Sequence, residues 1–376
     1  MSNIDHILLF IFLFTVFYCI TLNKQININK NFWKYNSIPI IVYSIILGCR
    51  YGWGNDFLWY KFRFEHPFRY EDESIGFRFV NLTIANLGLN YTVAFIIYSL
   101  TFIIGVFILL RFYKHNKYML CLFLPATLLF STATIRESFA ASFAYIAYYF
   151  LFKKNYLGMA LSLLCMNTIH SAPLLTFSLV TIIYLFNNRL LSIKYSIPLY
   201  IIIFFFSSKI ENYIIEPLNN VLSLITLENK YQGYIEEADY WFSEEGKNSI
   251  YKQSTFTAAL MFLFHISIIY IGYLGLKIRD NKYVRCFYHT VIVGFYLLNI
   301  FFELEILRRI AESLVQMYFI PVGYSISIIG KLKHNILPNK LFLYYKFALA
   351  FFIIYLILYF GRFIFLSPSF KFFWNI

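Results

Sequence analysis

Charged residues are scarce in this sequence: they make up 14% of its 376 residues, against about 25% in ordinary soluble domains. Hydrophobic residues account for 60% and aromatic residues for 22%. Several apolar runs are roughly 15 to 25 residues long, enough to cross a bilayer core of about 30 Å. The runs are continuous, whereas the strands of a transmembrane β-barrel alternate apolar and polar residues. We therefore expect an all-α polytopic integral membrane protein.

Several catalytic motifs are also missing. The sequence has no CxxC pair, no GxxxxGK[ST] phosphate loop, no HExxH and no GxSxG. Its five cysteines lie in or beside apolar runs, where they are expected to be buried as small hydrophobic residues. The net charge of +13 is interpreted as a bias of cytoplasmic loops rather than as a nucleic-acid surface. ATP-driven work would need a partner protein, because no such loop is long enough to form an ATPase domain.

The apolar runs predict about twelve transmembrane helices. The first run, which ends at Leu22, follows Asp5 rather than lysines, so it lacks the basic flank of a signal peptide and is interpreted as a membrane helix. The expected spans are 4–22, 36–49, 91–110, 118–134, 138–152, 155–169, 171–186, 195–208, 255–276, 286–301, 314–330 and 341–366.

The loops between these spans sort by charge. Every second loop is basic, and together these loops hold seventeen Lys and Arg residues against one acid, Asp280. The other eighteen acids lie in the remaining segments. By the positive-inside rule the basic loops are cytoplasmic, so both termini face outside. The basic loops are 23–35, 111–117, 153–154, 187–194, 277–285 and 331–340.

Two long segments on the expected outer side interrupt the single transmembrane domain, which covers residues 1–376. Segment 50–90 contains apolar residues at helical spacing within 74–90, which predicts a helix lying in the membrane interface. Segment 209–254 is acidic and rich in tyrosine, and its length and aromatic content favour a functional loop over a simple connector.

Two polar interruptions lie between short apolar runs. Arg136 and Glu137 stand in the sequence STATIRESFAAS, and an arginine within a membrane domain is usually paired or functional. The alternative is a tight outer turn held by an ion pair between these two residues. His170, in MNTIHSAP, precedes Pro173, a residue favoured at the start of a helix. The alternative for His170 is a packed, hydrogen-bonded residue without a chemical role.

Three further arginines are expected on the same outer side. Arg308 and Arg309 precede a span and have glutamates at helical distance, so a solvated helix start is the alternative to an anion site. Arg50 begins the segment RYGWGNDFLWY, whose two glycines permit a tight turn and which contains Asp56. An ordinary interfacial loop with an aromatic belt is the alternative there. Guanidinium groups suit phosphate, because the planar fork bonds two oxygens at once.

The order of these features resembles the EpsG-like polysaccharide polymerases, which are related to the Wzy-type O-antigen and capsule polymerases. The resemblance covers roughly residues 40–325. Its short motifs are an R-x-G-x-G-x-D-x-x-x-Y element (Arg50, Gly52, Gly54, Asp56, Tyr60), a G-(F/Y)-x-x-x-N segment (Gly76, Phe77, Asn81), an I-R-Q-x-x-A element (Ile135, Arg136, Glu137, Ala140), an H-S-A element (His170, Ser171, Ala172) and a C-terminal arginine (Arg309). Glu137 replaces the usual glutamine, which adds a negative charge beside the proposed phosphate ligand.

The resemblance implies a membrane glycosyltransferase of GT-C-like architecture, with short helices around an outward-facing cavity. It would polymerise lipid-linked oligosaccharide repeat units, moving the growing glycan from undecaprenyl diphosphate onto a new lipid-linked unit at the outer face of the bacterial cytoplasmic membrane. Its partners would be that lipid-linked glycan, the membrane lipids, and a chain-length regulator and flippase of the same pathway.

The resemblance and the residue chemistry then give candidate roles. Arginines would stabilise the charge that develops on the leaving diphosphate, and a base would take the proton of the acceptor hydroxyl. No nucleotide sugar is required, and no motif demands a metal cofactor, although the acids of segment 209–254 leave metal binding open. The diphosphate ligands are Arg50, Arg136, Arg308 and Arg309; the candidate bases are Asp56, Glu137 and His170; the sugar-stacking candidates are Tyr60, Tyr231, Tyr234, Tyr240 and Trp241.

Two other functions remain as alternatives. A lipid-linked oligosaccharide flippase or transporter would distribute charges through the bilayer and contain internal repeats, whereas the charges here gather at one side. An outer-face enzyme of another kind, such as an O-antigen ligase or an acyltransferase, would use the same arginine chemistry with a different acceptor.

Overall fold

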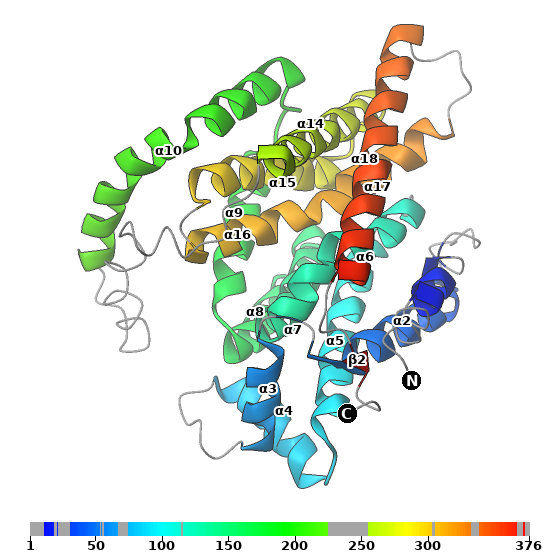
Figure 1. Ribbon diagram of the computed structural model, residues 1–376, viewed down its shortest axis with the longest axis vertical. Helices are drawn as coiled ribbons and strands as arrows, with labels where there is room; N and C mark the ends of the chain where they lie inside the picture. Colours follow the sequence, from blue (N-terminus) through cyan, green and yellow to red (C-terminus); the bar gives the residue numbers. More distant parts are fainter. Residues whose placement is uncertain are drawn as a thin grey trace.

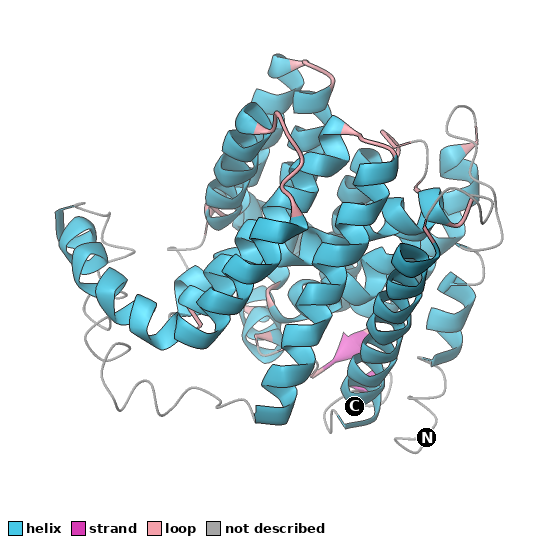
Figure 2. Ribbon diagram, turned by 90° about the horizontal axis from the view of Figure 1, so that it is seen from above, coloured by secondary structure: helices cyan, strands magenta, loops and turns pink. Residues whose placement is uncertain are grey.

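The computed structural model describes residues 11–18, 21, 31–52, 54, 56–66, 74–113, 116–224, 255–302, 305–331, 338–366 and 371–372. Within these ranges the regular secondary structure is helical apart from one pair of two-residue strands, and loops and turns join the helices (Figures 1 and 2). The expected all-helical class is therefore confirmed for the described part of the chain.

Helices form where the apolar runs lie, because a continuous apolar segment satisfies its backbone internally only as a helix. Residues 11–18 are helical, and the elements after them are α2 (Phe32–Gly48), β1 (Arg50–Tyr51), α3 (Phe57–Glu65), α4 (Ile75–Asn86), α5 (Tyr91–Leu110), α6 (Lys117–Ala133), α7 (Ile135–Phe152), α8 (Tyr156–Ile169), α9 (Ala172–Phe186), α10 (Ile193–Leu224), α14 (Thr255–Ile278), α15 (Lys282–Ile300), α16 (Glu305–Val315), the 3₁₀ turn η1 (Gln316–Tyr318), α17 (Phe319–Ile329), α18 (Asn339–Leu366) and β2 (Lys371–Phe372).

Three of the described helices are long and apolar enough to cross a membrane, and their candidate spans are Tyr91–Leu110, Thr255–Ile278 and Lys340–Tyr359. Shorter apolar helices include Lys117–Ala133, Tyr156–Ile169 and Ala172–Phe186. The helices follow the expected spans closely except around 314–330, where the end of α16, η1 and α17 replace one helix, and in α10. That helix continues to Leu224, so residues 209–224 are helical and do not form the first part of a loop.

Two groups of helices make the body of the protein. In the N-terminal group α5 packs between α2 and α7, and α7 packs on α8; in the C-terminal group α14 packs on α17 and α18, and α15 on α16. The groups meet where α6 contacts α17 and where α9 contacts α7, α15 and α16. In Figure 1 the N-terminal helices fill the lower part of the view and the C-terminal helices the upper part, with α10 along the left side.

The helix expected in the interface is α4. Its buried side consists of Phe77, Asn81 and Ile84, and the Asn81 amide oxygen accepts a hydrogen bond from the buried Tyr98 hydroxyl. Ile75 and Phe79, at 82% and 68% exposure, point away from the protein. A helix that packs on the protein by one face and offers an apolar stripe on another is suited to the membrane interface.

The strand pair joins distant parts of the sequence. Arg50 pairs with Phe372 and Tyr51 with Lys371, in antiparallel register. β1 follows the end of α2 and β2 follows α18, so these two helix ends lie on the same side of the molecule (Figure 1). The pairing fixes the backbone that leads directly into the turn at Gly52 and Gly54.

Candidate functional site

The candidate site is built around the first turn of α7, which carries Arg136 and Glu137. Its N-cap, Thr134, makes no side-chain capping bond, so the N–H groups of the first turn need other partners. One partner comes from α3, where the Tyr60 hydroxyl is hydrogen-bonded to the Arg136 backbone. The loop and helix after α2 thus contact the helix start that carries the arginine.

Gly54 brings the loop to this place. Its φ of +105° lies in the region that favours glycine, and a Cβ atom there would overlap the carbonyl oxygen of Thr132, at the end of α6. The Phe57 N–H donates to the Gly54 carbonyl over 3.1 Å, which starts α3 directly after Asp56. A close approach that only glycine allows therefore places α3 against the turn between α6 and α7.

Arg50 occupies a different kind of position from the one expected. Its guanidinium group is 1% exposed and donates to the carbonyl oxygens of Leu47 and, over 3.4 Å, Thr132, at the ends of α2 and α6. It also lies over the rings of Phe57 and Phe95, at 5.9 and 5.6 Å. These contacts satisfy helix-end carbonyls, so we assign Arg50 to holding the loop and leave it out of the diphosphate cluster proposed below.

Tyr60 is buried in the same place, where its ring packs on Phe77 of α4 at 5.8 Å. Burial raises the pKa of Tyr60 to about 12; the charge of Arg136 opposes the rise, and those of Asp56 and Glu137 add to it. Tyr60, Asp56, Arg136 and Glu137 are therefore close enough to interact electrostatically. The 7% exposure of Tyr60 leaves little surface for stacking on a sugar.

Helix α16 closes the site from the other side. The Ser313 hydroxyl donates to the Glu137 carboxylate over 3.2 Å and lies 3.0 Å from the Arg309 carbonyl oxygen. Arg309 is exposed, and its charge acts on Glu137. Arg308 forms an ion pair with Glu312, with 3.4 Å between Nε and Oε1. The side chains of two helices far apart in the sequence thus meet at one carboxylate.

Glu137 is the buried acid of this cluster, at 8% exposure, and it lies just ahead of the expected span 138–152. Burial raises the pKa of its carboxyl to about 7, against the opposing effects of the Ser313 hydrogen bond and of the charges of Arg309 and Arg136. A carboxyl with a pKa near neutrality can both accept and release a proton at neutral pH.

His170 lies at the turn between α8 and α9. Its N–H donates to the Met166 carbonyl over 2.9 Å and ends α8, and the residue is half-buried. The N-terminus of α4 sits on this turn, since the Ser74 hydroxyl donates to the Ile169 carbonyl and Gly76 lies against Thr168. These contacts place the turn at His170 under the N-terminus of α4.

The remaining sequence candidates are not all placed. Tyr231, Tyr234, Tyr240 and Trp241 lie outside the described residues. Among the described residues no group of three His, Cys, Asp or Glu side chains has a geometry that could hold a metal ion. Sequence reasoning missed Ser313; its only signal is a position one helical turn after Arg309, on the same face.

A family model for the EpsG family matches residues 33–373. The chain belongs to the EpsG family. This is a family of polysaccharide polymerases, and the resemblance drawn from the short motifs is confirmed. No curated protein and no solved structure matches the chain.

Membership in the EpsG family gives the site its context. Three of the family-like motifs surround the α7 start or the turn beside it: the arginine and glycines hold the loop, Gly76 and Phe77 dock α4, and Arg136 with Glu137 begins α7. Arg309 comes from α16. The apolar helices and the family together indicate a membrane protein.

Proposed function

We propose that this chain polymerises lipid-linked oligosaccharide repeat units, transferring the growing glycan from undecaprenyl diphosphate to a new lipid-linked unit. The observation that carries the proposal is the meeting of Arg136, Glu137, Arg309 and Ser313 at the start of α7 in a chain of the EpsG family. We further propose twelve spans of GT-C-like architecture in the bacterial cytoplasmic membrane, with the site and both termini outside.

The orientation is supported by how charges separate between the two ends of the helices. Arg136, His170 and Arg309 all lie in segments that alternate with the basic loops, so the twelve-span arrangement puts them on one side. Two of the basic loops, 187–194 and 277–285, contact each other. The Arg285 guanidinium donates to Asn187 and Asp280, and the Asn187 amide donates to the Lys282 carbonyl over 2.7 Å. The strand pairing of β1 with β2 agrees with a C-terminus on the side of segment 50–90.

In the proposed reaction, the acceptor hydroxyl oxygen attacks the anomeric carbon of the donor glycan. The bond between that carbon and the diphosphate oxygen breaks, and the electron pair leaves with the lipid diphosphate. Arg136 and Arg309 stabilise this charge, because preorganised cations in a partly dry site act more strongly than in water. The acceptor proton passes to Glu137, which the Ser313 hydrogen bond holds in place.

Among the three candidate bases we choose Glu137, because its carboxyl is buried beside both arginines. Asp56 stands at the start of α3 and acts electrostatically on Tyr60. His170 is assigned to the turn that supports α4. Arg308, paired with Glu312, contributes charge beside Arg309 rather than a free fork for the diphosphate.

A strain that lacks the gene tests the function. Loss of a polymerase leaves single repeat units on the terminal acceptor, loss of a flippase leaves no glycan outside, and loss of a ligase strands polymer on the carrier lipid. Unchanged chain length in the deletion strain would contradict the proposal.

Complementation with Arg136→Lys tests the site. We expect loss of most polymer at normal protein level, because lysine cannot form the two parallel bonds of the guanidinium fork. Arg111→Lys is the matched control. Arg111 is an exposed residue at the C-terminal end of α5, and that variant should restore full chain length. Normal polymer with Arg136→Lys would remove Arg136 from the mechanism.

A further inference from the structure

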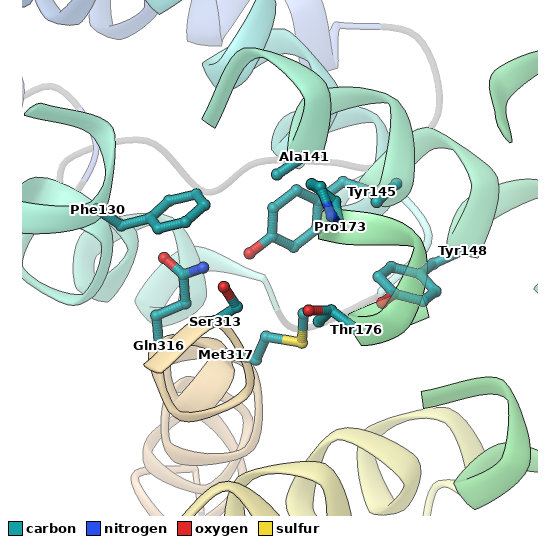
Figure 3. Close-up of a pocket in the computed structure, with 10 residues that line it drawn as sticks. Phe130, Ala141, Tyr145, Tyr148, Pro173, Thr176, Ser313, Gln316 and Met317 are labelled. Carbon is teal, nitrogen blue, oxygen red and sulfur yellow. The ribbon is translucent and has the colours of Figure 1, made fainter. Parts of the chain in front are cut away.

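A small cavity lies beside Ser313, the residue that donates to Glu137. Its walls come from α6, α7, α9, α16 and η1 (Figure 3). Its volume is about 10 Å³, which is the space that one water molecule requires. Ala141 and Ala144 of α7 form part of the wall, one and two turns after Glu137.

Polar atoms without partners line this cavity. The hydroxyls of Tyr145 and Tyr148 and the amide oxygen of Gln316 are buried and have no hydrogen-bond partner among the described residues. The three residues are 1%, 0% and 6% exposed. In Figure 3 the Tyr145 hydroxyl and the Gln316 amide lie on either side of the Ser313 hydroxyl. A buried polar group without a partner costs free energy, and native proteins commonly satisfy such groups with an internal water.

Three polar groups that line the cavity match the bonding capacity of a single water: the Tyr145 hydroxyl, the Gln316 amide and the Ser313 hydroxyl. A water can accept from the Tyr145 hydroxyl, bond the Gln316 amide and donate to the Ser313 oxygen. The Ser313 hydrogen is then directed to the Glu137 carboxylate, to which Ser313 already donates over 3.2 Å. Because each donor polarises the next, such a chain strengthens the last bond.

We propose that a water molecule occupies this cavity and completes a hydrogen-bond chain from Tyr145 and Gln316 through Ser313 to Glu137. The part of the proposal that concerns Glu137 rests on its proposed role as the base; the water site does not. Tyr145 and Gln316 are accordingly positioning residues, which act on the reaction only through the water and Ser313.

The water site is tested by the sign of stability changes in the full chain in lipid nanodiscs. In a wet cavity Tyr145→Phe removes a donor to the water and lowers the midpoint temperature of unfolding, and Ala144→Val, which fills the space, lowers it also. In a dry cavity both variants raise the midpoint, since one removes an unpaired hydroxyl and the other fills a void. Raised midpoints in both variants would overturn the proposal.

Tyr113→Phe is the matched control. Tyr113 is buried, and its hydroxyl also has no partner among the described residues, but it does not line this cavity. Removing that hydroxyl should leave the midpoint unchanged or raise it. An equal fall in Tyr113→Phe and Tyr145→Phe would show a general cost of replacing a buried tyrosine and would also overturn the proposal.

The link to Glu137 has a separate readout, the dependence of polymer formation on pH. Loss of the water weakens the bond from Ser313 and disfavours the ionised carboxylate, so the acidic limb of the profile moves to higher pH in Tyr145→Phe and Gln316→Leu. Tyr113→Phe should not move it. If the stability changes have the expected sign but the limb stays in place, the chain to Glu137 is refuted. The proposed function itself would fail differently, through unchanged chain length in the deletion strain.

Discussion

Ser313→Ala isolates the hydrogen bond on which the proposed base depends. The substitution removes one hydroxyl from a residue that is 5% exposed and leaves both arginines and the carboxylate in place. At 3.2 Å the bond to Glu137 is long for a hydroxyl donor. We therefore assign it about 1.5 kcal/mol, the lower end of the range for hydrogen bonds to charged groups.

The expected effect on activity follows from this energy. A shift of one pKa unit corresponds to about 1.4 kcal/mol, so the acidic limb of polymer formation should move up by about one pH unit. Since the pKa of Glu137 is about 7, the ionised fraction at about pH 6 falls roughly ninefold in the variant, whereas at about pH 9 it falls by only about a tenth. Low-pH activity should be lost and high-pH activity kept.

The assay measures polymer length and amount from purified protein in vesicles that contain a lipid-linked repeat unit, at a series of pH values. Ser267→Ala is the control, since Ser267 is also buried and donates over 2.9 Å to the Leu263 carbonyl within α14. An equal loss at every pH in Ser313→Ala would refute the reasoning, because it would show a packing defect rather than a change in proton affinity. A profile identical to that of the unmodified chain would also refute it.

Three other substitutions test the fold and the site. Gly54→Ala should lower stability by about 2 kcal/mol or more in thermal unfolding, because φ is +105° and a backbone carbonyl blocks the Cβ atom; Gly88→Ala, at φ +71° in open space, should cost less. Asn187→Ala should lower the unfolding midpoint by an amount equivalent to about 2 kcal/mol, since the buried Arg285 loses a side-chain acceptor at 3.0 Å, while chain length at permissive temperature stays normal. Glu137→Gln should abolish polymer formation. Because folding raises the carboxyl pKa from 4.5 to about 7, the unmodified chain loses stability as pH rises through this range, and the variant does not. The variant should therefore be as stable as the unmodified chain below about pH 4.5 and about 3 kcal/mol more stable above about pH 7.

The helices were predictable because continuous apolar sequence leaves the backbone few alternatives. The expected spans 155–169 and 171–186 correspond to α8 and α9 within one residue at each end. α10 was underestimated: its extension to Leu224 contains Lys and Glu residues that end the apolar run without ending the helix. Apolar length predicts where a chain can cross the membrane, and it does not predict where a helix stops.

The site was predictable in part. Charge bias predicted that Arg136, Asp56 and Arg309 share one side of the membrane. In the structure Arg136 interacts with Tyr60, and Glu137 interacts with Ser313 and Arg309 of α16. The carbonyl partners of Arg50 were not predictable, since an arginine before two glycines has the composition of an anion site. Its actual partners, carbonyls at the ends of α2 and α6, belong to two helices separated in sequence, and their convergence is a tertiary fact.

Glycine and asparagine of the G-(F/Y)-x-x-x-N motif also have structural partners. Gly76 permits the close approach of α4 to Thr168, and Asn81 accepts from Tyr98. Phe77 between them packs on Tyr60, which binds the start of α7. Short motifs of this chain therefore hold α3 and α4 against the turns that precede α7 and α9.

Helix length then bears on how deep the proposed site lies. α8 and α9 have 14 and 15 residues, or roughly 21 to 23 Å at 1.5 Å per residue, against a hydrocarbon core of about 30 Å. In the proposed orientation, with their basic ends level with the cytoplasmic surface, the His170 turn ends several ångströms below the outer boundary of that core. α4 lies on this turn and exposes Ile75 and Phe79 to the side. In that orientation a lipid diphosphate that passes below the outer boundary of the core would enter drier surroundings, which would strengthen the pull of the proposed arginines on it.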